Sequence, residues 1–357
     1  MEIPNHAFGN TKIGNTRCFG ASAWNNRGYR ACGSRSSHIE ASEKLVEVIP
    51  HLNWKVVQCN GCDSVKSAYK MKEYTQVTLP NYSYMFNFES DFVHQETLTW
   101  MSKNWTLGFY YCGIYMILVF GGQYVMQNRP RFELRGLLSL WNTALAIFSI
   151  MGAIRTVPEF LHILTHHGLY HSVCVPSFIE QDRVSGFWTW MFVLSKLPEL
   201  GDTIFIVLRK QPLIFLHWYH HITVLLYSWF TYTETTASAR WFIVMNYCVH
   251  AVMYSYYALR AMGYSPPRQI AMVITSLQLL QMVVGCAVNV WAQQLLNDHR
   301  ECQITHMNIK LSLAMYFSYF VLFARFFYKA YISGERRKKE RSAPVTAEYP
   351  LLKSKVQ

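Results

Sequence analysis

The sequence predicts an all-α, polytopic membrane protein with seven transmembrane helices. Of its 357 residues, 51% are hydrophobic and only 15% are charged, whereas a typical soluble domain carries roughly 25% charged residues. The apolar residues gather into runs, and each run is about as long as the roughly 20 residues that cross a bilayer as a helix. Because few charges interrupt these runs, a soluble globular domain is excluded.

The apolar runs divide the chain into three parts. Residues 1–80 form an Asn-, Gly- and Ser-rich extension that we expect to be largely disordered and luminal. Residues 81–335 form the helical domain, and residues 336–357 form a basic cytosolic tail. No cleavable signal peptide is visible, so we expect a transmembrane helix to direct membrane insertion. The predicted spans are residues 105–126, 137–155, 187–208, 212–232, 241–262, 269–291 and 311–332.

Basic residues in the short connections predict the orientation of these helices. Alternate connections carry arginine and lysine, whereas the intervening ones hold little more than Arg183 and Arg300. Positively charged loops stay in the cytosol, so we expect a cytosolic C-terminus and, with seven spans, a luminal N-terminus. The formal charge of +12 therefore reflects membrane orientation rather than nucleic-acid binding. The basic connections contain Arg129, Arg131, Arg135, Arg209, Lys210, Arg260 and Arg268.

Short motifs agree with this orientation and predict the compartment. Asn81-Tyr82-Ser83 is a glycosylation sequon on the predicted luminal side. Lys353 and Lys355 resemble a dilysine retrieval signal, which returns membrane proteins to the endoplasmic reticulum from a cytosolic tail. The predicted location is therefore the endoplasmic reticulum membrane. Cys174 and Cys302 fall in predicted luminal loops, where oxidising conditions permit a disulfide; two free thiols are the alternative.

Three histidines, His217, His220 and His221, lie near the cytosolic end of the fourth predicted span. Residues three and four apart share a helix face, so these side chains should point in roughly one direction. Polar groups within a membrane need partners inside the protein. One interpretation is a polar cluster that joins helices, and the other is a reaction centre.

Neighbouring spans also carry polar stripes. The third span holds Lys196, Glu199, Asp202 and Thr203 around Pro198, which we expect to kink the helix. Lys196 and Glu199 lie one turn apart, so a purely structural ion pair is an alternative to a functional role. Four consecutive polar stripes predict an enclosed polar pocket that opens to the cytosol. The remaining two stripes are Asn246, His250, Tyr254 and Tyr257, and Thr275, Gln278 and Gln281.

Four polar motifs occur along the chain in an order that resembles the elongases of very-long-chain fatty acids. The resemblance covers about residues 81–335 and does not extend to the first eighty residues. Trp218-Tyr219 inside the histidine motif is similar to the subgroup that acts on saturated and monounsaturated C12–C16 chains. The motifs are Lys196-x-x-Glu199-x-x-Asp202-Thr203, His217-x-x-His220-His221, Asn246-x-x-x-His250-x-x-Met253-Tyr254-x-Tyr256-Tyr257 and Thr275-x-x-Gln278-x-x-Gln281.

The resemblance implies seven helices around a narrow acyl tunnel and a condensing enzyme, a very-long-chain 3-oxoacyl-CoA synthase. Such an enzyme joins an acyl-CoA to malonyl-CoA, releases CO2 and CoA, and gives a 3-oxoacyl-CoA two carbons longer. No cofactor and no metal is expected for this step. The implied partners are membrane lipid and the separate 3-oxoacyl-CoA reductase, 3-hydroxyacyl-CoA dehydratase and enoyl-CoA reductase; homo-oligomerisation is left open.

The chemistry assigns roles to individual side chains. His220 and His250 are the predicted reacting pair, because a neutral imidazole can attack a thioester. Decarboxylation of malonyl-CoA produces an enolate that needs hydrogen-bond donors, and Lys196, Asn246 and Gln278 are the candidate donors. His217 and His221 complete the catalytic candidates. The predicted substrate-binding residues are Glu199, Asp202, Thr203, Tyr254, Tyr257, Thr275, Gln278 and Gln281.

Two other classes of protein share some of these features. A membrane di-iron desaturase or hydroxylase also uses His-x-x-His-His, together with further histidine boxes on the same side of the membrane. The apparent extra boxes are His162-x-x-x-His166 and His167-x-x-x-His171, which fall in the second-to-third loop, across the membrane from His217. A non-enzymatic seven-helix receptor shares the luminal N-terminus, but the buried Lys/Glu/Asp/His array argues against it.

Overall fold

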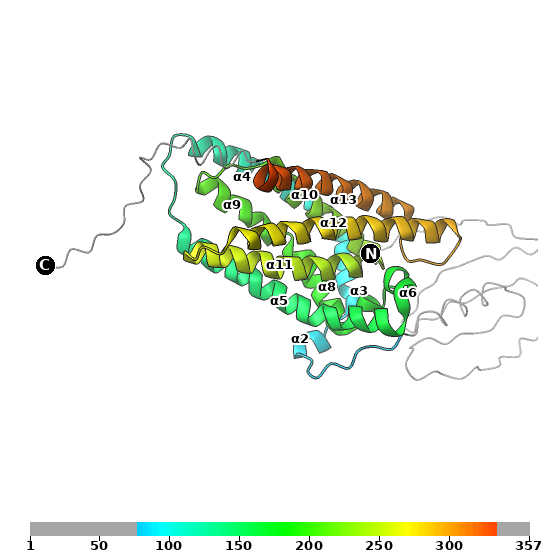
Figure 1. Ribbon diagram of the computed structural model, residues 1–357. Coiled ribbons are helices and arrows are strands. Elements are labelled where there is room, and N and C mark those ends of the chain that lie inside the picture. Colours follow the sequence, from blue (N-terminus) through cyan, green and yellow to red (C-terminus); the bar gives the residue numbers. More distant parts are fainter. Residues whose placement is uncertain (1–76, 334–357) are drawn as a thin grey trace, which may run out of the picture. The chain divides into compact units, whose positions relative to one another are not determined.

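Helices account for the regular structure of residues 77–333, which are the residues described by the computed structural model (Figure 1). Most of the N-terminal extension, residues 1–76, and the retrieval motif at Lys353 and Lys355 lie outside the described residues. In chain order the helices are α2 (Asn87–Ser90), α3 (His94–Asn104), α4 (Leu107–Met126), α5 (Arg135–His166), α6 (Gly168–Cys174), α7 (Ser177–Glu180), α8 (Arg183–Ser195), the 3-10 helix η1 (Pro198–Leu200), α9 (Gly201–Leu208), α10 (Phe215–Thr233), α11 (Ala239–Met262), α12 (Arg268–Asn297), α13 (His306–Phe327) and the π-helical turn η2 (Tyr328–Ile332).

The long helices lie side by side, with α5 packed along α11 and α12 packed along α13 (Figure 1). A Cβ atom on Gly152 of α5 would lie 2.2 Å from the ring of Tyr247 on α11. A Cβ atom on Gly285 of α12 would lie 2.6 Å from the ring of Tyr316 on α13. Small residues allow helix backbones to approach closely in membranes, so these two glycines set the packing distance of both helix pairs.

The chain is a multi-pass membrane protein. Within residues 77–333, four helices are long and apolar enough to cross a membrane, namely α4, α5, α12 and α13 with η2. Large apolar side chains on α4, among them Ile117 at 73% exposure, face outward, as expected for a surface in contact with lipid. Each of the other predicted spans is also helical, as α8 to α9, α10 and α11.

Helix α5 is longer than the apolar run that predicts it. It ends at His166 rather than at residue 155, and it continues through Pro158. Hydropathy identifies only the segment that suits the bilayer core, whereas the helix extends further because Glu159 and Ile163 are buried against neighbouring elements. The second-to-third connection, expected to be a loop, is therefore largely helical.

The third predicted span is interrupted where the sequence contains Pro198. Helix α8 ends at Ser195, η1 begins at Pro198, and α9 begins at Gly201. Proline removes a backbone donor and disturbs the preceding turn, so the predicted distortion is present as a break between two helices. Lys196 and Glu199 lie at this break, where the chain turns toward α11.

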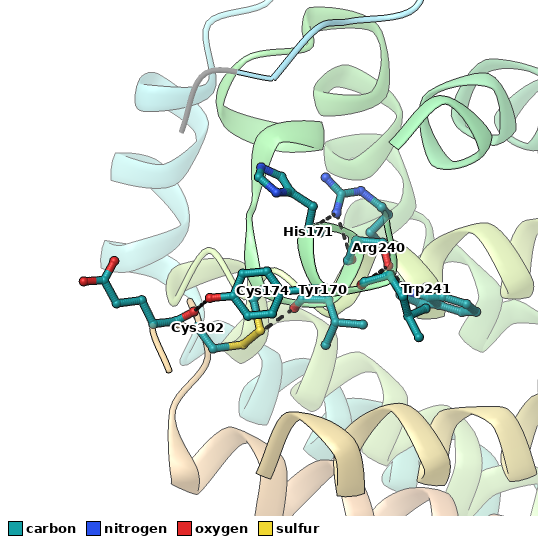
Figure 2. Close-up of a disulfide and its surroundings, with 10 residues drawn as sticks. Tyr170, His171, Cys174, Arg240, Trp241 and Cys302 are labelled. Carbon is teal, nitrogen blue, oxygen red and sulfur yellow. Dashed lines mark hydrogen bonds between the residues drawn. A yellow bond between two sulfur atoms is a disulfide. The ribbon is translucent and has the colours of Figure 1, made fainter. Parts of the chain in front are cut away.

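The bundle has two ends with different chemistry. The histidine end contains the start of α10, and the disulfide end contains α6, α7 and the bond between Cys174 and Cys302. Figure 1 shows α6 and α9 at opposite ends of the long helices. The disulfide joins α6 to the connection between α12 and α13, close to Arg240 and His171 (Figure 2).

The segment that precedes the first span packs onto the helical domain through polar contacts. Tyr82 donates to Asp182 at 2.5 Å, and burial raises the pKa of Asp182 above its usual range. Glu89 is fully buried and accepts from Arg155 and from the indole of Trp188. Asn81, the predicted glycosylation site, is exposed in an irregular segment.

Candidate active site

His217 and His221 occupy one face of α10, and His217 points toward α9. Nε2 of His217 lies 2.9 Å from Oγ1 of Thr203, and that hydroxyl lies 2.7 Å from the hydroxyl of Tyr115. The rings of His217 and His221 have centroids 4.5 Å apart. Nδ1 of His221 is buried and has no hydrogen-bond partner among residues 77–333. Predicted site residues from the third and fourth spans therefore meet here.

His220 faces a different part of the bundle. Its ring lies 4.9 Å from the ring of Tyr319 on α13, and its side chain lines a cavity inside the described domain. The sequence suggested one common direction for the three histidines. In the structure the three rings form one cluster, with the centroids of His220 and His221 5.5 Å apart, and His220 is the member that lines the cavity.

A polar chain connects the break in the third span to α11. Nζ of Lys196 donates to Oε1 of Glu199 at 2.7 Å and to Oδ1 of Asn246 at 3.2 Å. Nδ2 of Asn246 lies 3.1 Å from Nε2 of His250. Lys196 and Glu199 are 2% and 3% exposed, and buried charges are tolerated only when paired and hydrogen-bonded. Asn246 lines the cavity, whereas His250 does not, so the hydrogen bond to Asn246 links His250 to the cavity wall.

Asp202 joins three helices. It accepts from Nε1 of Trp141 at 2.6 Å and from the hydroxyl of Tyr254 at 2.8 Å. These bonds hold α9 against α5 and against α11, the helix that carries His250.

The predicted residues of the sixth span occupy different environments. Gln281 lines the cavity, whereas Gln278 contacts Sδ of Met253 at 3.2 Å. Thr275 donates to the carbonyl of Ala271, one turn earlier in α12. Tyr257 of the fifth span is 43% exposed. Tyr257 and Thr275 thus lie apart from the cavity, and substrate contact by either remains a prediction.

The cavity has a volume of about 740 Å³. His220, Asn246 and Gln281 form its polar part, and Phe178 and Ile179 of α7 line it near the disulfide end. Along α10 the lining follows three- and four-residue steps. The lining positions on this helix are His220, Val224, Tyr227, Ser228, Thr231 and Tyr232.

Several hydroxyl groups of the lining are bonded to partners in the protein. Tyr227 donates to Oδ1 of Asn308 at 2.7 Å, and Nδ2 of Asn308 donates to Thr231 at 3.2 Å and to Thr236 at 3.1 Å. The hydroxyl of Tyr232 lies 2.6 Å from that of Thr97 on α3. Satisfied hydroxyls do not require water in the cavity, so this part of the wall suits an apolar ligand.

A family model described as ELO, the GNS1/SUR4 family, matches residues 100–339. The chain belongs to this family. It is 70% identical over 276 residues to very long chain fatty acid elongase 6 of Drosophila melanogaster, which covers 77% of this chain and 87% of that protein. It is 51% identical to the human protein of the same name, over 72% of this chain and 96% of that protein. Human very long chain fatty acid elongase 3 is 43% identical, over 72% and 93%.

The elongase motifs identify the polar part of the cavity and miss the rest of its wall. Tyr227 and Thr231 continue the stripe of His220 along α10, so helical spacing was a usable signal for them. Phe178 lies on a four-residue helix, where no periodic pattern marks it. Asn308, which bonds Tyr227 and Thr231 of the wall, lies near the start of α13 and is not marked by a pattern either.

Proposed function

We propose that this elongase holds the acyl chain of an acyl-CoA in the cavity, with the thioester at His220, and condenses it with malonyl-CoA. Membership of the elongase family supports the reaction class. The observation that supports this placement of the substrate is the cavity itself, which extends from His220 to Phe178 and has wall hydroxyls bonded to partners in the protein.

The length of the cavity agrees with a long acyl chain. The lining positions of α10 from His220 span about 16 Å to Thr231 and about 18 Å to Tyr232, at about 1.5 Å per helical residue. Carbon–carbon bonds of about 1.5 Å advance about 1.25 Å each in an extended zigzag chain. This length accommodates roughly 13 to 15 carbons, which lies within the C12–C16 range implied by the sequence resemblance.

The reaction proceeds in two steps at the histidine end. A ring nitrogen of His220 attacks the thioester carbonyl, the C–S bond breaks, and CoA leaves as the thiol, carrying the proton that the imidazole gives up. Malonyl-CoA then loses CO2, and its enolate attacks the acyl-imidazole carbonyl. The C–N bond breaks, 3-oxoacyl-CoA is formed, and the departing imidazolide takes up one proton from solvent, which regenerates neutral His220. Lys196 and Asn246 supply donors for the developing oxyanions, while His250 is the second candidate for carrying the acyl group.

The same proposal includes the arrangement in the membrane. In this arrangement seven spans cross the membrane, the histidine end faces the cytosol, and the disulfide end faces the lumen of the endoplasmic reticulum. CoA then stays on the cytosolic side, and Cys174 and Cys302 lie where disulfides persist. The product is a 3-oxo thioester, so a reductase, a dehydratase and a second reductase must act on it next. No cofactor is needed for the condensation.

Purified full-length protein incubated with palmitoyl-CoA alone tests the covalent scheme. We expect release of about one equivalent of CoA and a mass increase of one acyl group on a peptide that contains His220. His220→Ala should lose the adduct. If the wild-type enzyme releases CoA only when malonyl-CoA is also present, the acyl-enzyme scheme is wrong and the histidines act as acid–base groups in a direct condensation.

A further inference from the structure

A second, smaller cavity lies next to the larger one and shares part of its wall. It is a gap between side chains that is too narrow to hold a water molecule. Phe178, Thr189 and Ile243 line both cavities. These three side chains, from α7, α8 and α11, therefore separate the two spaces, and we call them the partition.

The smaller cavity contains a buried ion pair. Arg240 and Glu159 are each 1% exposed and pair through two bonds, Nε to Oε2 and Nη2 to Oε1, both 3.0 Å long. Both residues line the smaller cavity and are absent from the lining of the larger one. A hydrocarbon chain that passed the partition would meet charged groups, which offer it little favourable contact.

Arg240 also holds the partition in place. Its remaining N–H groups donate to the carbonyls of His171 and Ser172 at 3.2 and 2.8 Å and to Oγ of Ser177 at 2.6 Å. Arginine has five donors, and all five are used in these contacts and the pair with Glu159. The guanidinium lies 4.9 Å from the centre of the Phe178 ring. Arg240, with all of its N–H groups hydrogen-bonded, therefore packs directly against Phe178.

We infer that the partition sets the longest acyl chain that this enzyme elongates, and that Arg240 is a positioning residue that keeps Phe178 in it. The inference rests on the proposed function, because it assumes that the acyl chain occupies the larger cavity. The disulfide end thus limits chain length through Phe178 itself, with the ion pair as a closed wall behind it.

Removing the Phe178 ring should extend the larger cavity into the space that the ring fills, up to the ion pair. Each buried CH2 contributes about 0.8 kcal/mol, so a two-carbon extension contributes up to about 1.6 kcal/mol, or roughly 15-fold. In Phe178→Ala we expect the activity on a substrate two carbons beyond the wild-type limit, relative to the optimal substrate, to rise about tenfold. The ion pair should prevent further extension, so the new limit should be one step longer.

The experiment offers full-length enzyme malonyl-CoA and saturated acyl-CoAs from C12 to C22 and measures each product by mass spectrometry. Met315→Ala is the matched control, because Met315 lines the larger cavity from α13 and does not belong to the partition; it should change rates without moving the limit. An unchanged limit in active Phe178→Ala, or an equal shift in Met315→Ala, overturns the inference. If wild-type enzyme condenses none of the substrates, the proposed function fails instead.

Arg240→Lys tests the positioning role. Lysine keeps the charge but lacks the planar fork of donors, so Phe178 should lose its fixed position. The folded enzyme should show the same shift toward longer products as Phe178→Ala, although smaller. A uniform loss of activity on all chain lengths, with the limit unchanged, would show that Arg240 is only structural. Should this variant fail to fold, Phe178→Ala and Phe178→Leu still decide the role of the partition.

Discussion

The two ends of the larger cavity each have a buried ion pair nearby, and the pairs differ in how many of their N–H donors have partners. At the histidine end, Lys196 uses two of its three N–H groups, on Glu199 and Asn246. At the disulfide end, all five donors of Arg240 have partners in the described chain. Lys196 therefore has one N–H group free of these bonds and contacts Asn246 of the cavity wall, so it can donate a hydrogen bond to a substrate. Arg240 has no N–H group left for a substrate, so its role is to hold neighbouring residues in position.

The largest effect should come from the histidines themselves. His220→Ala should lower condensation by about 10²–10⁴-fold, because it removes the group that carries or moves the reacting atoms. His250→Ala should lower it to a similar degree, and the double variant should fall little further, since residues that act as a unit are not additive. Rates measured with saturating palmitoyl-CoA and malonyl-CoA check this.

His166→Ala is the control for that comparison, because His166 is exposed at the disulfide end. It should retain wild-type activity. Multiplicative losses in the His220→Ala/His250→Ala double variant would mean that the two residues act independently.

The two ion pairs should respond differently to the loss of one partner. Lys196→Met removes a donor from the active site, and we expect activity to drop about 10²–10³-fold even in protein that folds. Glu159→Gln leaves Arg240 buried without its charge partner, which costs about 3–5 kcal/mol of stability. Thermal unfolding in detergent, together with activity per folded molecule, distinguishes these outcomes. Equal losses of both quantities in both variants would remove the distinction between reactive and structural pairs.

This contrast also explains how much the sequence could predict. Apolar runs and the order of four motifs identified the helices, Lys196, Glu199 and the histidines, since these depend on composition and helical spacing. The role of Arg240 could not be read in the same way. Arg240 is a single charged residue at the border of a predicted span, and no motif includes it. Its partner Glu159 lies 81 positions earlier in the chain. Contacts of that separation are set by tertiary packing, which one sequence does not encode in any local pattern.

The break near Pro198 and the length of α5 show the same limit. Proline indicated a distortion but not that it would place Lys196 beside Asn246 on another helix. Hydropathy found the membrane part of α5 and not its extension to His166, because the extension is stabilised by burial of Glu159 and Ile163 rather than by lipid.

Loss of the disulfide should have a moderate effect on stability. The bond between Cys174 and Cys302 closes a sequence separation of 128 residues, and native disulfides typically contribute about 2–4 kcal/mol. The Cys174→Ser/Cys302→Ser variant should unfold at a lower temperature, whereas Cys286→Ser, which removes a free thiol, should not. Added reductant should lower the unfolding temperature of the wild type and leave the double variant unchanged. If both cysteines of denatured, non-reduced wild-type protein react with an alkylating reagent, the bond is absent.

The smallest effect concerns chain length in the wild-type enzyme, and it compares the two directions along the cavity. A substrate that is two carbons too short leaves space near Phe178 and loses only the burial of two CH2 groups, about 1.6 kcal/mol or roughly 15-fold. A substrate that is two carbons too long must displace the partition, and overpacking a closed site costs about 1–3 kcal/mol in addition to the lost contact. Activity plotted against chain length should therefore fall gradually below the optimum and steeply above it. Relative kcat/KM for saturated acyl-CoAs in direct competition measures this without interference from solubility differences between separate assays. A symmetric profile would mean that the cavity is open at the disulfide end, and that the fully bonded Arg240 does not close it.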